Sequence, residues 1–188
     1  MPQITIQEGL TRKKTIFKRI EGLMLSCGGE AIAREAQKRD PYLSVGGSAE
    51  FIQRRKQAIK DLFENYLTIV TQIQKVNLEV AFTIEGETYS VAAWLEWKRH
   101  IHGKLANFAA AQANAVKQVR DRCSREGRAV IKSATEEQAP TDAIVNVNEA
   151  DLAKELDRLT KMLGTLEGLL SLNACTTKIE IQDDVEAT

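Results

Sequence analysis

The sequence predicts a mainly α-helical protein: an antiparallel helical bundle or coiled coil of long helices with a small antiparallel β-sheet. Long segments carry apolar residues at alternating spacings of three and four, which keeps one helix face apolar. Two shorter segments alternate apolar and polar residues as strands do, a hairpin at about 79–91 and a C-terminal strand at about 177–182. We expect one helical domain over 1–188.

The first helix should begin near Ile6, because "TIQE" at residues 5–8 is a capping box. In this motif the Thr and Glu side chains each accept a hydrogen bond from a backbone amide of the other residue. The helix is expected to run to about Leu25. Its predicted apolar stripe, with Lys13 as the one polar interruption, consists of Ile6, Leu10, Phe17, Ile20 and Met24.

Glycine pairs and Pro41 break the helical pattern at about 26–48. A short helix at about 30–38 fits, followed by a loop. Loops of this length in compact domains are usually functional or mobile, so this irregular segment is a candidate contact arm. Its candidate assembly contacts are Tyr42 and Leu43.

A strong heptad pattern follows Ser48, which is a good N-cap residue. The predicted helix extends to Val76, and its stripe comprises Ile52, Ile59, Leu62, Tyr66, Ile69, Ile73 and Val76. Asn77 is expected at its end, because asparagine tolerates the left-handed conformation found there.

The hairpin is predicted to turn at Glu85-Gly86, and Ser90 can cap the helix that comes next. The alanines of this helix should let it pack closely against residues 48–76 as an antiparallel partner. Trp94 and Trp97 are candidate core or interface anchors. The predicted stripe is Trp94, Trp97, Ile101, Leu105, Phe108, Ala111, Ala115 and Val119.

Helical signals weaken at about 126–148, a second irregular arm whose candidate contacts are Ile144 and Val145. The cleanest heptad in the chain then predicts another helix, with the stripe Leu152, Leu156, Leu159, Leu163, Leu166 and Leu170. It should end near Asn173, before the strand at about 177–182 and a flexible acidic tail at 183–188.

That last strand contributes Ile179 and Ile181 as candidate contacts. A lone hairpin is marginally stable in water, whereas a third strand makes a sheet viable. We therefore expect the strand to pair with the hairpin, and one edge of the resulting sheet to stay open to a neighbour.

Composition and charge narrow the class of protein. The three cysteines (Cys27, Cys123 and Cys175) form no Cys-x-x-Cys pair, so we expect reduced side chains and neither a disulfide framework nor a zinc site. No apolar run predicts a transmembrane helix and no signal peptide is apparent, so a cytoplasmic location is expected and no membrane partner.

Charge is balanced overall but divided along the chain. Residues 1–132 hold 22 Lys and Arg against 14 Asp and Glu, and residues 133–188 hold 4 against 12. Two basic clusters, at 12–19 and 117–132, could contact phosphates. Few aromatic residues accompany them and the chain is neutral, so nucleic acid is not the expected partner.

The sequence contains no recognisable reaction centre. His100 and His102 are two residues apart, so on a helix they point about 200° apart and cannot bind one ion from one face. A phosphate-binding glycine loop and a nucleophile elbow are also missing from the sequence. We predict no catalytic, cofactor-binding or metal-binding residues, no small-molecule substrate and no enzymatic activity.

The layout resembles small helical proteins encoded among the structural genes of tailed bacteriophages and prophages. The resemblance is carried by "ITIQEGLTRKKTIFKRI", "FTIEGETYSVAAWLEWK", the leucine-heptad helix and the closing "LLSLNACTTKIEI". A second likeness is to septicolysin-like helical proteins, which share a long helix, an Asn, a short Gly-containing hairpin and a capped helix. The segments at 26–48 and 124–148 depart from these layouts.

The phage resemblance implies a non-enzymatic virion component in many copies, assembled in the bacterial host cytoplasm. Its expected roles are capsid decoration, capsid cementing or head-tail joining. The expected partners are further copies of the chain and other virion proteins of the capsid, portal or tail. The alternative is a cytoplasmic coiled-coil protein that associates with nucleic acid or binds in a regulatory role through its basic first two-thirds.

Overall fold

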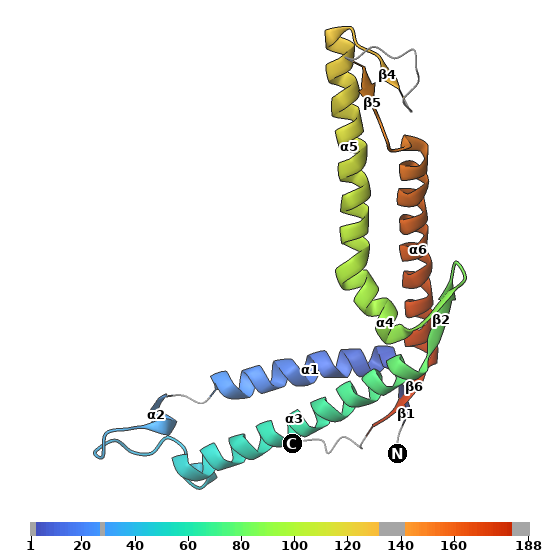
Figure 1. The fold of residues 1–188 in the computed structure, drawn as a ribbon. Helices are drawn as coiled ribbons and strands as arrows, with labels where there is room; N and C mark the ends of the chain where they lie inside the picture. The colour runs from blue at the N-terminus through green and yellow to red at the C-terminus, as the bar shows by residue number, and fades with distance from the viewer. Residues whose placement is uncertain (1–2, 27–28, 132–141, 182–188) are drawn as a thin grey trace. The chain divides into compact units, whose positions relative to one another are not determined.

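The computed structural model describes residues 3–26, 29–131 and 142–181, and it is mainly α-helical with short strand pairs, as predicted (Figure 1). The contacts within the chain define two compact units. Unit 1 comprises Met1–Val80 with Ser171–Thr188, and unit 2 comprises Ala81–Leu170.

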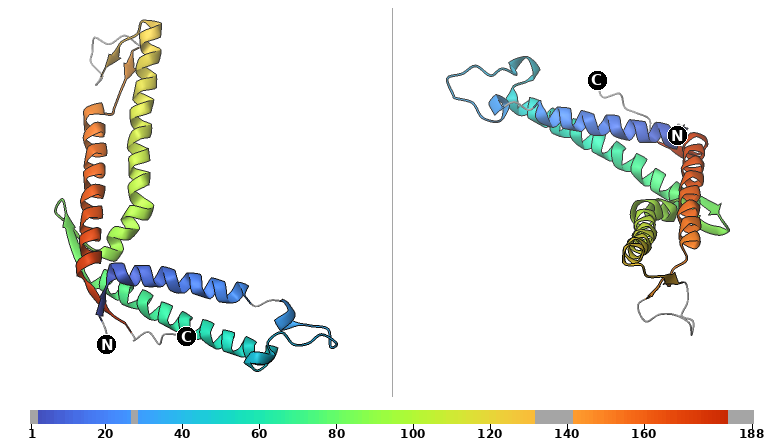
Figure 2. Two further views of the ribbon diagram at one scale, coloured as in Figure 1. Left: turned by 180° about the vertical axis from the view of Figure 1, so that it is seen from behind. Right: turned by 90° about the horizontal axis from the view of Figure 1, so that it is seen from above.

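Unit 1 is built on helices α1 (Ile6–Leu25) and α3 (Ser48–Glu79), which lie side by side and antiparallel (Figures 1 and 2). The capping box predicted for α1 is confirmed. The amide of Glu8 donates to Thr5 Oγ1 across 3.2 Å, and the amide of Thr5 donates to Glu8 Oε2 across 2.8 Å. The backbone hydrogen bond from Thr5 lowers the pKa of Glu8.

The α3 stripe is confirmed, since its seven residues are buried or half-buried. The α1 stripe is corrected: Ile6 faces the core, but Leu10, Phe17 and Met24 are 44%, 52% and 60% exposed. The core row of α1 lies one position earlier, at Gly9, Ile16 and Leu23. Gly9 permits this register because a Cβ there would lie 2.8 Å from Ile179 Cδ1 and 3.5 Å from Ile73 Cδ1.

Strand pairing also differs from the expectation. Strand β6 (Lys178–Glu180) pairs antiparallel with β1 (Gln3–Thr5), with Ile4 opposite Ile179, and not with the hairpin. The predicted three-stranded sheet is therefore wrong. Ile4, Ile179 and Ile181 are buried in the core of unit 1, which explains the preference: pairing with β1 covers three apolar side chains against α1 and α3.

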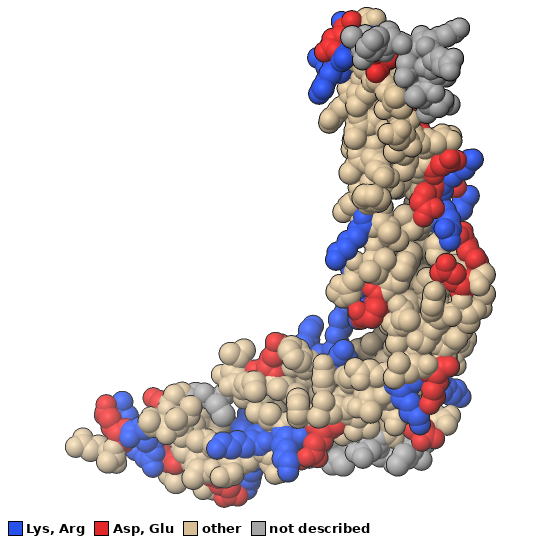
Figure 3. All heavy atoms as spheres, in the orientation of Figure 1, with Lys and Arg blue, Asp and Glu red and all other residues tan. Residues whose placement is uncertain are grey.

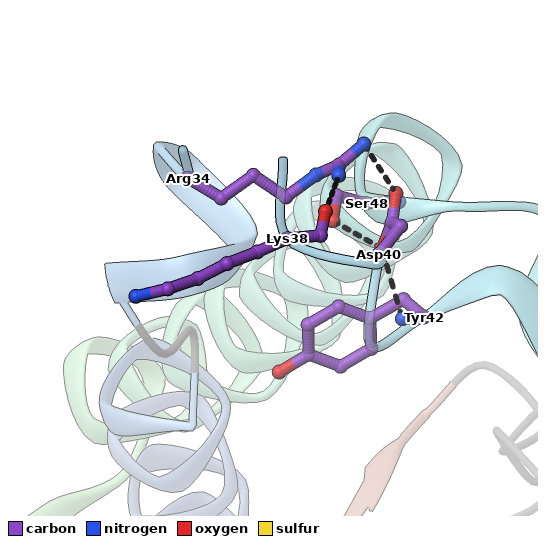
Figure 4. Close-up of polar contacts among 5 residues, drawn as sticks. All are labelled: Arg34, Lys38, Asp40, Tyr42 and Ser48. Carbon is purple, nitrogen blue, oxygen red and sulfur yellow. Dashed lines mark hydrogen bonds and ion pairs between the residues drawn. The ribbon is translucent and has the colours of Figure 1, made fainter. Parts of the chain in front are cut away.

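Within residues 29–47, the described part of the segment between α1 and α3, lie α2 (Gly29–Ile32), which is shorter than the predicted helix at 30–38, and the 3₁₀ helix η1 (Leu43–Val45). The Asp40 side chain fixes the part of this segment that leads into α3 (Figure 4). Its carboxylate accepts hydrogen bonds from the Ser48 amide (2.9 Å), the Ser48 hydroxyl (2.7 Å) and the Tyr42 amide (2.9 Å). Ser48 is therefore the first residue of α3 and Gly47 its N-cap, which corrects the predicted start.

Unit 2 begins with the predicted hairpin, β2 (Ala81–Ile84) and β3 (Glu87–Ser90). Glu85 and Gly86 both have positive φ, 50° and 86°, as a two-residue turn of this kind requires. Ser90 caps α4 (Val91–Glu96) by accepting the Ala93 amide, also as predicted. Two helices end later than predicted. Helix α3 continues past Asn77 to Glu79, and α6 (Glu149–Thr176) continues past Asn173.

A π-helical segment, η2 (Trp97–Ile101), separates α4 from α5 (His102–Glu126). A π turn holds one extra residue, so the buried face of α5 shifts by one position from the predicted stripe. Ala109, Val116 and Cys123 are buried, whereas Ile101, Leu105 and Phe108 are 45%, 41% and 64% exposed.

Helix α5 belongs to unit 2 and α3 to unit 1, so the predicted pairing of these two helices is corrected. Helix α5 instead lies beside α6 (Figures 1 and 2). Arg120 of α5 forms an ion pair with Glu149 of α6 at 2.6 Å. The leucine heptad of α6 is confirmed, with Leu159 and Leu166 buried and the other four half-buried. The short parallel pair β4 (Val130–Ile131) and β5 (Ala143–Ile144) lies beyond α5.

Candidate assembly surfaces

The two histidines, the side chains considered above as possible metal ligands, contact neighbouring side chains. His100 Nε2 lies 3.3 Å from a carboxylate oxygen of Glu96, while the ring of His102 meets Trp97 edge-on at a centroid distance of 5.2 Å. Within residues 3–26, 29–131 and 142–181, no group of three or more His, Cys, Asp or Glu side chains could hold a metal ion.

An open depression of about 440 Å³ lies at the start of α1 and is lined by Thr5, Gln7, Glu8, Thr11, Arg12 and Cys175. Its polar groups serve the fold: Glu8 closes the capping box, and the thiol of Cys175 donates to Gln7 Oε1 across 2.8 Å. Because the Cys175 thiol bonds to an amide oxygen, the lining presents no activated nucleophile with a neighbouring base. Of the other two cysteines, Cys123 is buried and Cys27 lies outside the described residues.

The most distinctive surface of unit 1 is an apolar face along α1 and α3, which we call the outer face. Leu10, Phe17 and Met24 repeat every seven residues along α1, one position beyond its core row. In an antiparallel pair, the equivalent positions of α3 lie on the same side. Phe63 holds one of them and is 50% exposed, and Leu67 follows one turn later at 46%.

Two contacts at the edge of the core support this placement. The ring of Phe17 lies 6.4 Å from that of Tyr66, and Lys13 Nζ lies 5.7 Å from the centroid of the same Tyr66 ring. Lys13, the polar interruption of the predicted stripe, is therefore accommodated by a cation–π contact. The aliphatic and aromatic side chains next to it stay open to solvent.

Unit 2 carries a second apolar row, formed by Ile101 at the end of η2 and by Leu105 and Phe108 on α5. These residues are four and three positions apart, so they share one helix face. The π-helical segment turns this row away from the α6 side, where Ala109 and Val116 are buried. Figure 3 shows charged side chains of both signs between broad tracts of uncharged ones.

The predicted contact residues divide into two groups. Trp94, Ile179 and Ile181 are at most 4% exposed, so they are core residues of the single chain and offer no surface. Leu43 and Ile144 are 56% and 43% exposed. Trp97, Tyr42 and Val145 are half-buried, with Tyr42 stacked on Phe51 at a centroid distance of 4.0 Å.

Sequence patterns could have revealed the outer face. α1 carries apolar residues at three heptad positions, more than one seam uses, and a third apolar position indicates a second packing surface. The sequence prediction merged the two rows of α1 into one stripe and did not single out Phe63 or Leu67.

No described helix combines the length and apolar character that crossing a lipid bilayer requires. Comparison of the chain with models of protein families, with curated proteins and with solved structures returned no match.

Proposed function

We propose that this chain is a structural component of a tailed-phage virion, working in many copies as a capsid decoration or cement protein or in head-tail joining. The observation that carries the proposal is that each unit leaves an apolar helix row uncovered, the outer face in unit 1 and Ile101, Leu105 and Phe108 in unit 2. Soluble monomers rarely expose large contiguous apolar patches unless a partner binds there.

The positions of these rows support assembly through helix packing. Each row follows the three-four or seven-residue spacing with which one helix packs on another. Leu43 and Ile144 add exposed apolar side chains on the irregular segments, where adaptable contacts to a neighbour are expected. The phage assignment itself rests on the resemblance in sequence layout.

Mass spectrometry of particles purified from the host that encodes this chain tests the proposal. We expect peptides of the chain in the particles, at a copy number in a fixed ratio to the major capsid or portal protein. Separating heads from tails before digestion distinguishes the head and neck roles from a tail role. Absence of the chain from particles that contain the other structural proteins would contradict the proposal.

One observation favours a second candidate, nucleic-acid association. Five basic residues lie on two turns of α1, namely Arg12, Lys13, Lys14, Lys18 and Arg19. Binding to mixed-sequence DNA at 50 and 200 mM salt separates the candidates, because phosphate contacts lose affinity steeply as salt rises. No binding at the lower salt concentration would end the nucleic-acid hypothesis.

A further inference from the structure

We propose that the outer face of unit 1 binds the same face of a second copy of the chain, with the two α1 helices antiparallel about a two-fold axis beside Phe17. This inference deepens the assembly role and rests on it in part, because it specifies one contact between copies. The face consists of Leu10, Phe17 and Met24 on α1 with Phe63 and Leu67 on α3.

The size of the face fits a protein partner. Its five large side chains are between 44% and 60% exposed. Taking the range of about 150–250 Å² that an aromatic side chain buries as an upper guide for all five, they together present on the order of 400–600 Å² of apolar surface. A stable interface covers about 800 Å² per partner, of which about 57% is non-polar, or roughly 450 Å². The outer face therefore supplies the apolar part of one half-interface.

The charges beside the face favour a second copy over an unrelated partner. Lys14 lies three residues before Phe17 and Glu21 lies four residues after it, so both border the same row. Among the described residues, no ion pair with either of them is observed within 4 Å. A two-fold axis at Phe17 places residue 14 of one copy opposite residue 20 of the other, one position from Glu21. The long Lys14 side chain therefore reaches Glu21 of the other copy, and by symmetry this pair forms twice.

The same symmetry matches the apolar residues. Leu10 of one copy lies opposite Met24 of the other, and the two Phe17 rings meet at the axis. An interface of this kind is isologous, since one patch serves both partners, and two-fold dimers are the commonest soluble oligomers. Two helical hairpins that meet in this way form a four-helix arrangement in which the outer face becomes a second core.

Sedimentation equilibrium of the purified full-length chain tests the proposal. We expect a reversible dimer, and Phe17→Glu should weaken it at least about thirtyfold, as loss of a central interface anchor does. Leu25→Glu is the matched control, because Leu25 lies on the same helix, is 86% exposed and falls outside the heptad row. Circular dichroism verifies that each variant is folded.

Reversing the charges of Lys14 and Glu21 provides a second test of the dimer that does not depend on Phe17. Lys14→Glu and Glu21→Lys should each weaken the dimer about three- to tenfold, since each leaves two like-charged contacts. The double variant restores both pairs and should recover wild-type affinity. Rescue of this kind requires two copies of this chain in the proposed register.

A monomer at every concentration would overturn the inference, and so would a dimer that survives Phe17→Glu or a double variant that shows no rescue. These outcomes are independent of the virion experiment. A chain that dimerises through the outer face but is missing from particles would retain this inference and contradict the virion function. A chain found in particles but monomeric when purified would do the reverse.

Discussion

The indole Nε1 of Trp94 donates a hydrogen bond to the backbone carbonyl oxygen of Phe82 across 3.0 Å. Trp94 is 1% exposed, and its ring meets those of Tyr89 and Trp97 edge-on at 5.3 and 5.6 Å. One buried side chain therefore joins helix α4 to strand β2 and fills the centre of the unit 2 core.

Replacing Trp94 with Phe should lower the free energy of unfolding by about 2–4 kcal/mol, because the variant loses the hydrogen bond and leaves a cavity. Urea denaturation followed by far-ultraviolet circular dichroism measures the change. Trp97→Phe is the control: Trp97 is half-buried, and a loss of less than about half that size is expected. Equal losses in the two variants would contradict the central role of Trp94.

Two glycines of α1 provide a matched test of packing. A Cβ at Gly9 would lie 2.8 Å from Cδ1 of Ile179, which is 2% exposed, whereas a Cβ at Gly22 meets no atom within 4 Å. Alanine at either position gains about 0.5–1 kcal/mol of helix stability over glycine. Gly22→Ala should therefore raise the free energy of unfolding by about that amount.

Gly9→Ala gains the same helix propensity but crowds Ile179, and overpacking in a core costs about 1–3 kcal/mol. We expect this variant to be neutral or destabilised by up to about 2 kcal/mol, and Gly9→Val to be destabilised further. Thermal unfolding of the three variants should rank Gly22→Ala first and Gly9→Val last. A rise in stability for Gly9→Ala equal to that for Gly22→Ala would contradict the close α1–β6 packing.

Local sequence signals predicted the local structure well. The capping box at Thr5 and Glu8, the Glu85-Gly86 turn and the Ser90 cap are confirmed, because each depends on residues only a few positions apart. The heptads of α3 and α6 are confirmed for a similar reason: each presents one dominant apolar row. The mainly helical fold follows from these features.

Non-local relationships were harder to predict. Alternation at 177–182 identifies a strand, but it does not say which edge the strand joins, and β1 is only three residues long. The buried face of α5 depends on one extra residue in a π turn, and no pattern in the sequence predicts that residue. The sequence places Phe17 and Leu105 of the candidate assembly surfaces in the predicted apolar stripes, because periodicity cannot tell the core row of a helix from its neighbour.

Deletion of Arg99 should test the one-residue insertion in η2. Removing one residue from a π turn restores a regular α-helix and leaves the faces on either side in their original directions. The Arg99 side chain is 62% exposed and forms a surface ion pair with Glu96, the one observed for it within the described residues, so its loss costs little. We expect helix content and unfolding free energy close to those of the wild type.

The buried thiol of Cys123 reports on the register of α5, because Cys123 is 1% exposed in the present structure. Its reaction with a thiol reagent should remain slow after deletion of Arg99. Deletion of Lys117, which lies in regular helix, should rotate the following residues by about 100° and make Cys123 reactive. Fast reaction of Cys123 in the Arg99 deletion would contradict a π insertion at this position.

Asp40 should titrate at unusually low pH. Hydrogen bonds from the Ser48 amide, the Ser48 hydroxyl and the Tyr42 amide stabilise its carboxylate, and Arg34 lies 3.6 Å away, so the pKa of Asp40 falls from 3.8 to about 2. A lowered pKa in the folded state means that these bonds stabilise the fold fully above about pH 4. Their contribution is lost as the pH falls from about 4 towards 2.

Carbon-detected NMR titration of the Asp40 carboxyl group measures this directly, with an expected midpoint of about 2. Ser48→Ala removes the hydroxyl donor (2.7 Å) but keeps the backbone amide, so the midpoint should rise towards 3.8 without reaching it. Thr68→Ala is the control, because the Thr68 hydroxyl donates to the Glu64 carbonyl oxygen elsewhere in the same helix. A midpoint near 3.8 in the wild type would show that Asp40 does not hold the entry to α3, and the loop would then need another anchor.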